Sequence, residues 1–166
     1  MNLVRKNQMK TTKLVPRIAL GAVIVFMGIQ VVPYGRNHVN PPISQEPAWN
    51  MTETRALAKR ACFDCHSNET QWPWYSNVAP VSWLTQRDTL TGRRKMNFSE
   101  WNLPQKKAGD AAEEVQKGDM PLWFYTPLHP AAKLTPPERQ ALIAGLQATM
   151  GKRDGRSSKE SEERDH

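Results

Sequence analysis

The residues best suited to chemistry in this sequence lie together in the segment Cys62-Phe63-Asp64-Cys65-His66. The segment is a C-x-x-C-H motif, and it contains both cysteines of the 166-residue chain. Two thiols at this spacing can each form a thioether with a vinyl group of a porphyrin, and the histidine that follows can ligate the iron. The motif therefore predicts one covalently attached haem c, with Cys62 and Cys65 as attachment points and His66 as the proximal iron ligand.

Three other uses of the cysteine pair are open on the sequence. A thioredoxin-like dithiol is typical of a βαβ pattern, and none is visible around the motif. A structural zinc site needs further ligands at metal spacing, but the remaining histidines are only His38, His129 and His166. The pair could also be coincidental and form a strained local disulfide. The sequence favours haem attachment over these three alternatives.

A sixth iron ligand is expected further along the chain. Met120 precedes Pro121 on a predicted loop before the last helix, and a methionine paired with a histidine on iron is typical of cytochromes c. We predict Met120 as the distal haem-iron ligand, with His129 as the alternative. Met96 and an open or water-bound iron are further alternatives. The alternative to a ligand role for Met120 is the ordinary role of a methionine, which is to fill a gap in the core.

Aromatic residues follow the motif closely in the run Trp72-Pro73-Trp74-Tyr75. Indole rings can pack against a porphyrin and donate their N–H to a propionate. We therefore predict haem packing by Trp72 and Trp74, with the filling of a small helical core as the alternative. Arginines such as Arg93 could pair with the propionates, although most surface arginines are solvated.

An N-terminal leader is predicted over residues 1–33. Residues 1–17 contain five basic residues and no acidic one, and an apolar run of 15 residues follows over 18–32. This order is typical of an export signal, although the run is short for a spanning helix of about 20 residues. Because no small-x-small cleavage site follows, we expect a single-pass anchor in the bacterial inner membrane with the rest of the chain in the periplasm. A cleaved signal with a secreted periplasmic protein is one alternative, and a buried core helix is the other.

The rest of the chain divides by composition. Proline-rich residues 34–49 predict a linker, and residues 50–150 predict a folded domain. Residues 151–166 have no large apolar side chain and predict a disordered polar tail. Because much of the net charge of +7 comes from the leader, the body has no strong basic footprint, and no nucleic-acid partner is expected.

Within residues 50–150 the apolar spacing predicts helices and no strand. The expected helices cover residues 52–62, 81–94, 104–117 and 136–150. Asn50 with Glu53 predicts a capping box at the first helix, and Gly118 predicts the end of the third. Thr135 with Glu138 predicts a capping box at the last helix. The predicted fold class is a small all-α domain, with long proline-rich loops around a covalent haem.

Three long segments carry a family resemblance: CFDCHSNETQWPWYSNVAPVSWL, GRRKMNFSEW and GDMPLWFYTPLHPAAKLTPPER. Residues 50–150 resemble the bacterial haem-binding domain family with a C-x-x-C-H motif, whose members are exported and cytochrome c-like. The resemblance implies covalent haem at Cys62 and Cys65 and iron ligation by His66. The chain end is also similar to that of a class I cytochrome c, which matches Met120 to the distal ligand position. The long loop that contains His129 departs from that pattern.

The motif, the leader and the resemblance together favour one function. We expect a c-type cytochrome that transfers electrons on the periplasmic side and works with membrane-bound redox partner proteins. An electron carrier is favoured over an enzyme with its own substrate. A haem peroxidase-like redox enzyme is one alternative, and it would need an open sixth position on the iron. A haem-based sensor is another, and it would need a signalling module from a partner chain.

Overall fold

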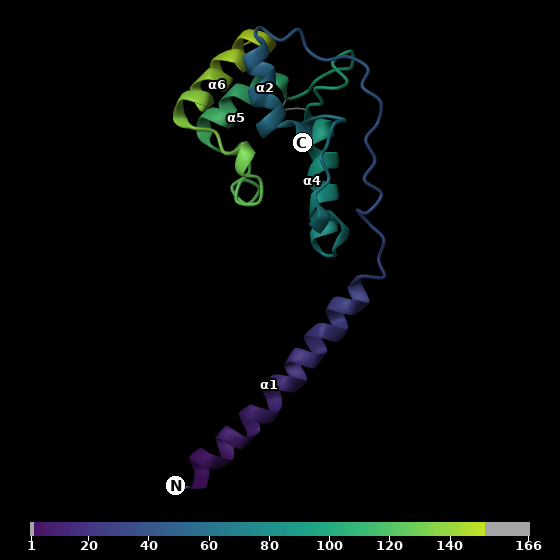
Figure 1. The fold of residues 1–166 in the computed structure, drawn as a ribbon, viewed down its shortest axis with the longest axis vertical. Helices are drawn as coiled ribbons and strands as arrows, with labels where there is room; N and C mark the ends of the chain where they lie inside the picture. The colour runs from purple at the N-terminus through teal and green to yellow at the C-terminus, as the bar shows by residue number, and fades with distance from the viewer. Residues whose placement is uncertain (1, 152–166) are drawn as a thin grey trace, which may run out of the picture. The chain divides into compact units, whose positions relative to one another are not determined.

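The computed structural model describes residues 2–151, with side chains from residue 14 onwards. These residues form helices joined by long loops, and the pairing of extended segments within them is limited to a bridge between Gln45 and Glu100 (Figure 1). The predicted all-α class is confirmed for this part of the chain. The elements are α1 (Asn2–Ile29), α2 (Thr52–Ala61), α3 (Phe63–His66), η1 (Trp74–Asn77), α4 (Val81–Lys95), η2 (Ala108–Asp110), α5 (Ala111–Lys117), η3 (Pro130–Ala132) and α6 (Pro136–Met150).

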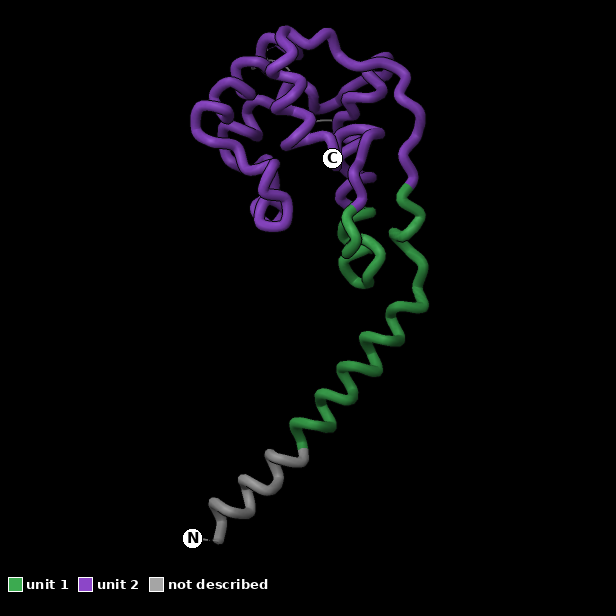
Figure 2. The backbone as a smooth tube through the Cα atoms, viewed as in Figure 1, with its two compact units in different colours: residues 1–38, 73–87 green, residues 39–72, 88–166 purple. Residues whose placement is uncertain are grey.

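The chain divides into two compact units, which Figure 2 shows in different colours. Unit 1 contains residues 1–38 and 73–87, and unit 2 contains residues 39–72 and 88–166. Residues 39–49, which were expected in the linker, therefore group with unit 2.

Helix α1 covers most of the predicted leader. It contains Pro16 and ends at Ile29, and its side chains from Leu14 to Met27 are exposed. Within residues 2–151, no helix combines the length and the apolarity that crossing a membrane requires. The side chains of the basic residues before Leu14 and the predicted disordered tail after Gly151 lie outside the described part.

In unit 1, the Gln30 side chain bonds to the backbone of Ala79 in both directions. Gln30 Nε2 donates to the Ala79 carbonyl at 2.9 Å, and Gln30 Oε1 accepts from the Ala79 N–H at 3.0 Å. Arg36 Nη2 donates to the same Oε1 at 3.0 Å. The end of α1 is thus connected to the loop that leads into α4.

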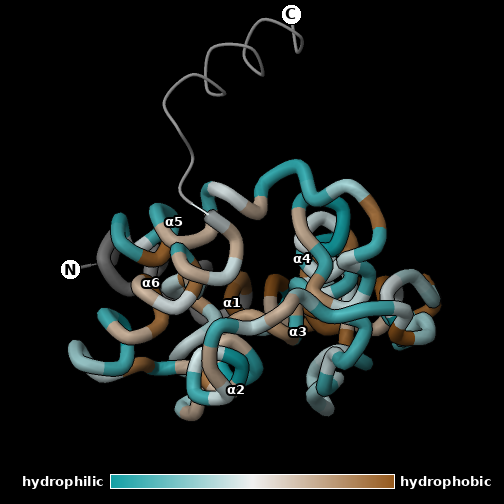
Figure 3. The backbone as a smooth tube through the Cα atoms, turned by 90° about the horizontal axis from the view of Figure 1, so that it is seen from above, coloured by the Kyte–Doolittle hydropathy of each residue, from teal (hydrophilic) through white to brown (hydrophobic). Residues whose placement is uncertain are grey.

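The core of unit 2 lies where α6 packs against α2 and α5 (Figure 1). Hydrophilic and hydrophobic residues alternate in short stretches along these helices, as expected for elements with one buried face (Figure 3). Gly145 of α6 lies directly against the buried Thr54 of α2, where an added Cβ would overlap the threonine side chain. The buried apolar residues are Leu57, Ala58, Ala61, Phe63, Met96, Phe98, Ala112, Val115, Leu142, Ile143 and Leu146.

Three of the expected helices lie close to their predicted bounds, and the signals for two helix ends are confirmed. Gly118 ends α5 in the left-handed conformation with φ of 87°. Thr135 and Glu138 form the capping box of α6. The helix expected over 104–117 begins later than predicted, because the Gln105 side chain binds the loop before it. Gln105 Oε1 accepts from Asn97 N at 2.8 Å, and its Nε2 donates to Glu100 O at 2.7 Å.

The predicted capping box at Asn50 is wrong. Met51 is the N-cap of α2 and accepts no side-chain capping bond. Asn50 instead pairs with Thr149 of α6: its N–H donates to the Thr149 hydroxyl at 3.2 Å, and its Oδ1 accepts from that hydroxyl at 3.1 Å. Asn50 thus connects the start of α2 to the end of α6.

Residues 39–49 are extended, as the prolines predict, but they dock on unit 2. The backbone N–H groups of Ser44 and Gln45 donate to the Ser99 carbonyl at 2.9 and 3.1 Å. Trp49 packs on Phe98 with ring centroids 5.1 Å apart. This part of the predicted linker therefore contributes to the core.

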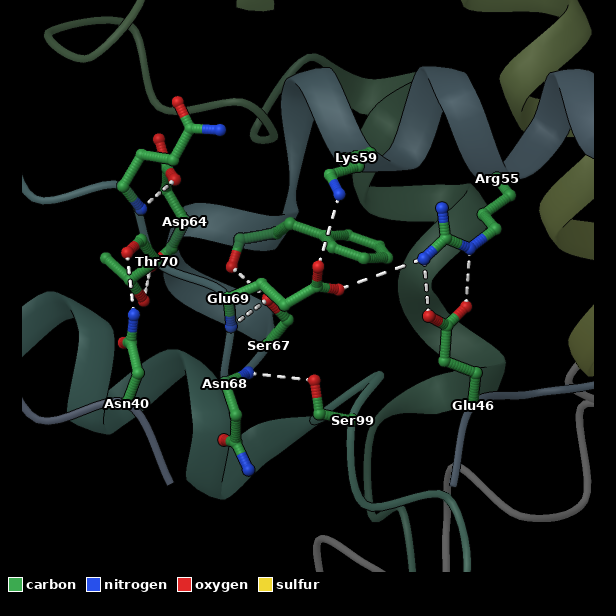
Figure 4. A network of polar contacts seen from close by, with 12 residues as sticks. Asn40, Glu46, Arg55, Lys59, Asp64, Ser67, Asn68, Glu69, Thr70 and Ser99 are labelled. Carbon is green, nitrogen blue, oxygen red and sulfur yellow. Dashed lines mark hydrogen bonds and ion pairs between the residues drawn. The ribbon is translucent and has the colours of Figure 1, made fainter. Parts of the chain in front are cut away.

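Glu46 in this segment forms an ion pair with Arg55 of α2 (Figure 4). Arg55 donates from Nε at 2.7 Å and from Nη2 at 2.5 Å, and Trp49 Nε1 donates to the same carboxylate at 2.7 Å. The hydrogen bond from Arg55 lowers the pKa of Glu46 most strongly, and burial opposes it. A carboxyl whose pKa is lowered by folding stabilises the fold above its unfolded pKa.

We predict that Glu46→Gln lowers the free energy of unfolding at pH 7 by about 1–2 kcal/mol, because it breaks a charge-assisted pair that is partly exposed. The difference from wild type should shrink as the pH falls through the folded-state pKa of Glu46, where the native carboxylate also loses its charge. Urea unfolding followed by tryptophan fluorescence between pH 7 and pH 3 measures both effects. Glu113→Gln is the control, because its exposed pair with Lys117 on α5 should contribute little. A loss that does not vary with pH would contradict the assignment.

Candidate functional site

The C-x-x-C-H motif forms a helical turn at the end of α2. Cys62 donates its N–H to the Ala58 carbonyl at 2.8 Å, and His66 donates its N–H to the Cys62 carbonyl at 2.9 Å. Residues four apart lie on the same side of a helix. The turn therefore places the His66 ring on the same side as the Cys62 thiol.

The His66 ring is oriented by the segment that follows α4. Nδ1 lies 3.1 Å from the Met96 carbonyl, to which it donates, and the His66 carbonyl accepts from Phe98 N at 2.8 Å. Burial lowers the pKa of His66, and hydrogen bonding to the backbone of Met96 opposes this shift less strongly. The neutral ring thus carries its proton on Nδ1 and leaves the lone pair of Nε2 for a metal, which is the usual arrangement of a ligating histidine.

Polar residues that follow His66 in the sequence also hold the motif against residues 96–99. Asn68 N donates to Ser99 Oγ at 2.9 Å (Figure 4), and Asn97 Nδ2 donates to Asn68 Oδ1 at 2.9 Å. Asn68, Asn97 and Ser99 are all buried. Because buried polar groups of this kind are costly to leave unpaired, the network fixes one arrangement of the motif against residues 96–99.

Cys65 lies against α4 at Gly92. A Cβ at Gly92 would lie 2.9 Å from the Cys65 carbonyl carbon and closer still to its oxygen. Glycine at this position lets the backbones of α3 and α4 come into contact. Gly92 is therefore a close-packing position of α4.

The two cysteines are free thiols in the structure. Burial is the main cause that raises the pKa of Cys62 to about 12, and burial followed by the charge of Asp64 raises the pKa of Cys65 to about 12. Thiol-exchange enzymes instead need a cysteine with a lowered pKa, so the thioredoxin-like alternative finds no support in this environment.

A cavity of about 250 Å³ lies beside the motif, within unit 2. It brings Cys62, His66 and Met120 together, whereas Cys65 is not among its lining residues. The core residues Phe98, Val115 and Leu146 give it apolar walls. The lining residues are Ala61, Cys62, His66, Lys95, Met96, Phe98, Lys107, Asp110, Ala111, Glu114, Val115, Met120 and Leu146.

Met120 reaches the cavity from the loop after α5. Its N–H donates to the Glu114 carbonyl at 3.2 Å, directly after the turn at Gly118. The side chain is partly buried and packs against the core. Met96, the other methionine considered from the sequence, is buried and also lines the cavity.

The other predicted contacts lie elsewhere among the described residues. His129 stacks on Tyr125, with ring centroids 3.8 Å apart, and donates from Nδ1 to the Tyr125 carbonyl at 3.0 Å. Trp72 donates from Nε1 to Asn40 Oδ1 at 3.2 Å, and Trp74 is 79% exposed. None of these three residues lines the cavity.

Arg93 binds the polypeptide itself. Its guanidinium donates to the carbonyls of Ser67 and Val39 at 2.8 and 3.0 Å, and to the side chains of Asn40 and Thr70, both at 2.9 Å. These bonds connect α4 to the loop after the motif and to the docked segment 39–49. Arg93 therefore stabilises the fold around the motif.

Four charged residues at the cavity were not predicted from the sequence. They are Lys95, Lys107, Asp110 and Glu114. Lys107 N donates to the Lys95 carbonyl at 3.1 Å, which brings the loop before η2 to the end of α4. The sequence contains no motif for these positions, because only the folding of that loop brings them to the cavity.

Taken together, a partly buried neutral histidine, two thiols and apolar walls define a small helical domain suited to a haem. The chain belongs to the haem-binding domain family, whose model matches residues 24–148. No curated protein and no solved structure matches the sequence.

The residues at the cavity fit a haem chemically. His66 presents Nε2 as a nitrogen ligand, Met120 offers a thioether, and the apolar walls suit the porphyrin face. Lys95 provides positive charge for a carboxylate, whereas Lys107 Nζ already lies 3.6 Å from Asp110 Oδ2. Among residues 2–151, no group of three histidine, cysteine or acidic side chains is arranged to bind a metal ion by itself.

We predict that Gly92→Ala destabilises the domain by about 1–3 kcal/mol, because the new methyl group overlaps the Cys65 backbone. In an ordinary helix the same change stabilises the fold by about 1 kcal/mol, so the sign of the change in unfolding free energy is diagnostic. Urea unfolding compares the variant with Gly21→Ala in α1, where an added Cβ meets no atom within 4 Å. Unchanged or increased stability of Gly92→Ala would disprove the close contact.

Proposed function

We propose that this protein is an electron-transferring c-type cytochrome with one haem c bound covalently at Cys62 and Cys65. The observation that supports the proposal is the cavity, which is lined by His66, Cys62 and Met120. When bound, the haem iron supplies one-electron redox chemistry. The chain sets the ligands of the iron and its access to water.

His66 serves as the proximal ligand in this proposal. Its Nδ1–H bond to the Met96 carbonyl fixes the tautomer and raises the basicity of Nε2. Phe98, through its N–H bond to the His66 carbonyl, fixes the backbone of the motif. The His66 side chain then needs little rearrangement when the oxidation state of the haem iron changes.

Met120 is the proposed sixth ligand. It lines the same cavity as His66, whereas His129 stacks on Tyr125 away from the lining residues. A thioether on iron raises the reduction potential and leaves no open position for substrates. This arrangement favours electron transfer over the peroxidase-like and sensor functions.

We further propose that the chain is exported to the periplasm and stays attached to the inner membrane through its N-terminal residues. The support is the basic segment followed by the apolar run of α1. Membrane-bound redox proteins are the proposed partners.

Covalent attachment is tested on the haem-loaded full chain by extraction with acidic organic solvent. We predict that the wild type keeps its haem on the polypeptide, and that Cys62→Ser and Cys65→Ser each keep it through the remaining thioether. The double variant should release all of it while His66 remains. Pyridine haemochrome spectra of the pellet and the extract measure the distribution. Release of haem from the wild type would contradict the proposal.

The sixth ligand is tested with Met120→Ala and His129→Ala in the ferric protein. We predict that Met120→Ala loses the methionine–iron charge-transfer band and binds cyanide at least about tenfold more tightly, since its iron has no protein ligand to displace. His129→Ala should keep the band. Met51→Ala, at an exposed methionine, is the control. Absence of the band from the wild type, together with tighter cyanide binding in His129→Ala and not in Met120→Ala, would assign the ligand to His129.

A further inference from the structure

A hydrogen bond connects the haem motif to the loop that carries Met120. The Tyr125 hydroxyl donates to Asp64 Oδ2 at 2.5 Å. Asp64 lies between the two cysteines of the motif, and Tyr125 lies five residues after Met120. Because a hydrogen bond to a carboxylate is about twice as strong as one between neutral groups, this contact is a candidate for fixing the loop.

Asp64 is itself fixed through both its side chain and its backbone. Its Oδ1 accepts from Gln71 N at 2.9 Å, and its carbonyl accepts from the Thr70 hydroxyl at 2.7 Å (Figure 4). The carboxylate is thus a rigid acceptor on the motif. Tyr125 therefore bonds to a point whose position relative to Cys62 and His66 is set by the fold.

The loop between Pro121 and His129 obtains little stabilisation from burial of its large side chains. Trp123 is 82% exposed, and Leu128 is 63% exposed. Tyr125 stacks on His129 within the loop, and Arg60 Nε donates to the Ala131 carbonyl at 3.0 Å beyond it. The Tyr125–Asp64 bond lies nearer to Met120 in the sequence than the Arg60–Ala131 bond does, so it has the larger effect on where the thioether lies.

We infer that Tyr125 is a positioning residue that keeps Met120 at the cavity through its bond to Asp64. The inference rests on the proposed ligation by Met120 and deepens it. Fixing the loop lowers the conformational entropy that Met120 loses when it binds iron, so the thioether competes better with external ligands. Without the bond, the Met120-bound state is a smaller fraction of the population.

The test compares Tyr125→Phe with wild type in the haem-loaded full chain. We expect an increase of about tenfold in the apparent cyanide affinity of the ferric protein, and loss of the methionine–iron band at a lower temperature. Asp64→Asn should have an effect in the same direction, and the double variant should add little to either single change, because one bond is lost in each case. Far-ultraviolet circular dichroism checks that the variants are folded.

Two controls separate positioning from other effects. Tyr34→Phe removes the hydroxyl of an exposed tyrosine in unit 1, and Ile143→Val loosens the core of unit 2 at a residue of α6, outside the loop. Both should retain the cyanide affinity of the wild type. An Ile143→Val effect as large as that of Tyr125→Phe would show general loosening and overturn the positioning role.

The remaining outcomes distinguish the inference from the function on which it rests. If the wild type has the methionine–iron band and Tyr125→Phe behaves as wild type does, the positioning role is wrong and ligation by Met120 stands. If the wild type has no such band and Met120→Ala leaves its cyanide affinity unchanged, ligation by Met120 and the positioning role are both wrong.

Discussion

The site depends on the contact between the haem motif and the segment that follows α4. The Met96 carbonyl accepts the Nδ1 proton of His66, and the N–H of Phe98 donates to the carbonyl of the same histidine. Gly92 permits this approach, because it carries no Cβ between α4 and Cys65. These contacts fix the ring and its tautomer, so they determine which nitrogen is offered to a metal.

The loops around the motif are held largely by hydrogen bonds. The domain is small, and its loops use buried polar side chains where a larger protein would use more apolar surface. Asn68, Asn97 and Ser99 bond to one another, and Arg93 donates to several groups around the motif. Such networks favour one arrangement strongly, since breaking one bond leaves a buried group unpaired. A further hydrogen bond, from Tyr125 to Asp64, connects the loop after Met120 to the motif itself.

The sequence predicted the local features well. The motif predicted the haem-binding site class, and the family match supports it. The capping box at Thr135 and the stop at Gly118 are confirmed, because each depends on residues within a few positions of one another. The box predicted at Asn50 failed because that side chain pairs with Thr149, which is 99 residues away.

The long-range features were not predictable in the same way. Trp49 and Trp101 surround Phe98 in the core, a role that no local pattern shows. The extended segment over 39–49 looked like a linker because its contacts with Ser99 are backbone hydrogen bonds, which leave no signature in side-chain periodicity. The charges of Lys95 and Lys107 reach the cavity only through the folding of the loop between them.

The central claim concerns one atom: Nε2 of His66 binds the haem iron while Nδ1 keeps its proton for Met96. A crystal structure of the haem-loaded protein tests this claim most directly. The account predicts iron bonded to Nε2, the Met96 carbonyl still within hydrogen-bonding distance of Nδ1, and the porphyrin in the cavity between the motif and α5. Iron bonded to another residue, or a His66 ring turned away from Met96, would contradict it.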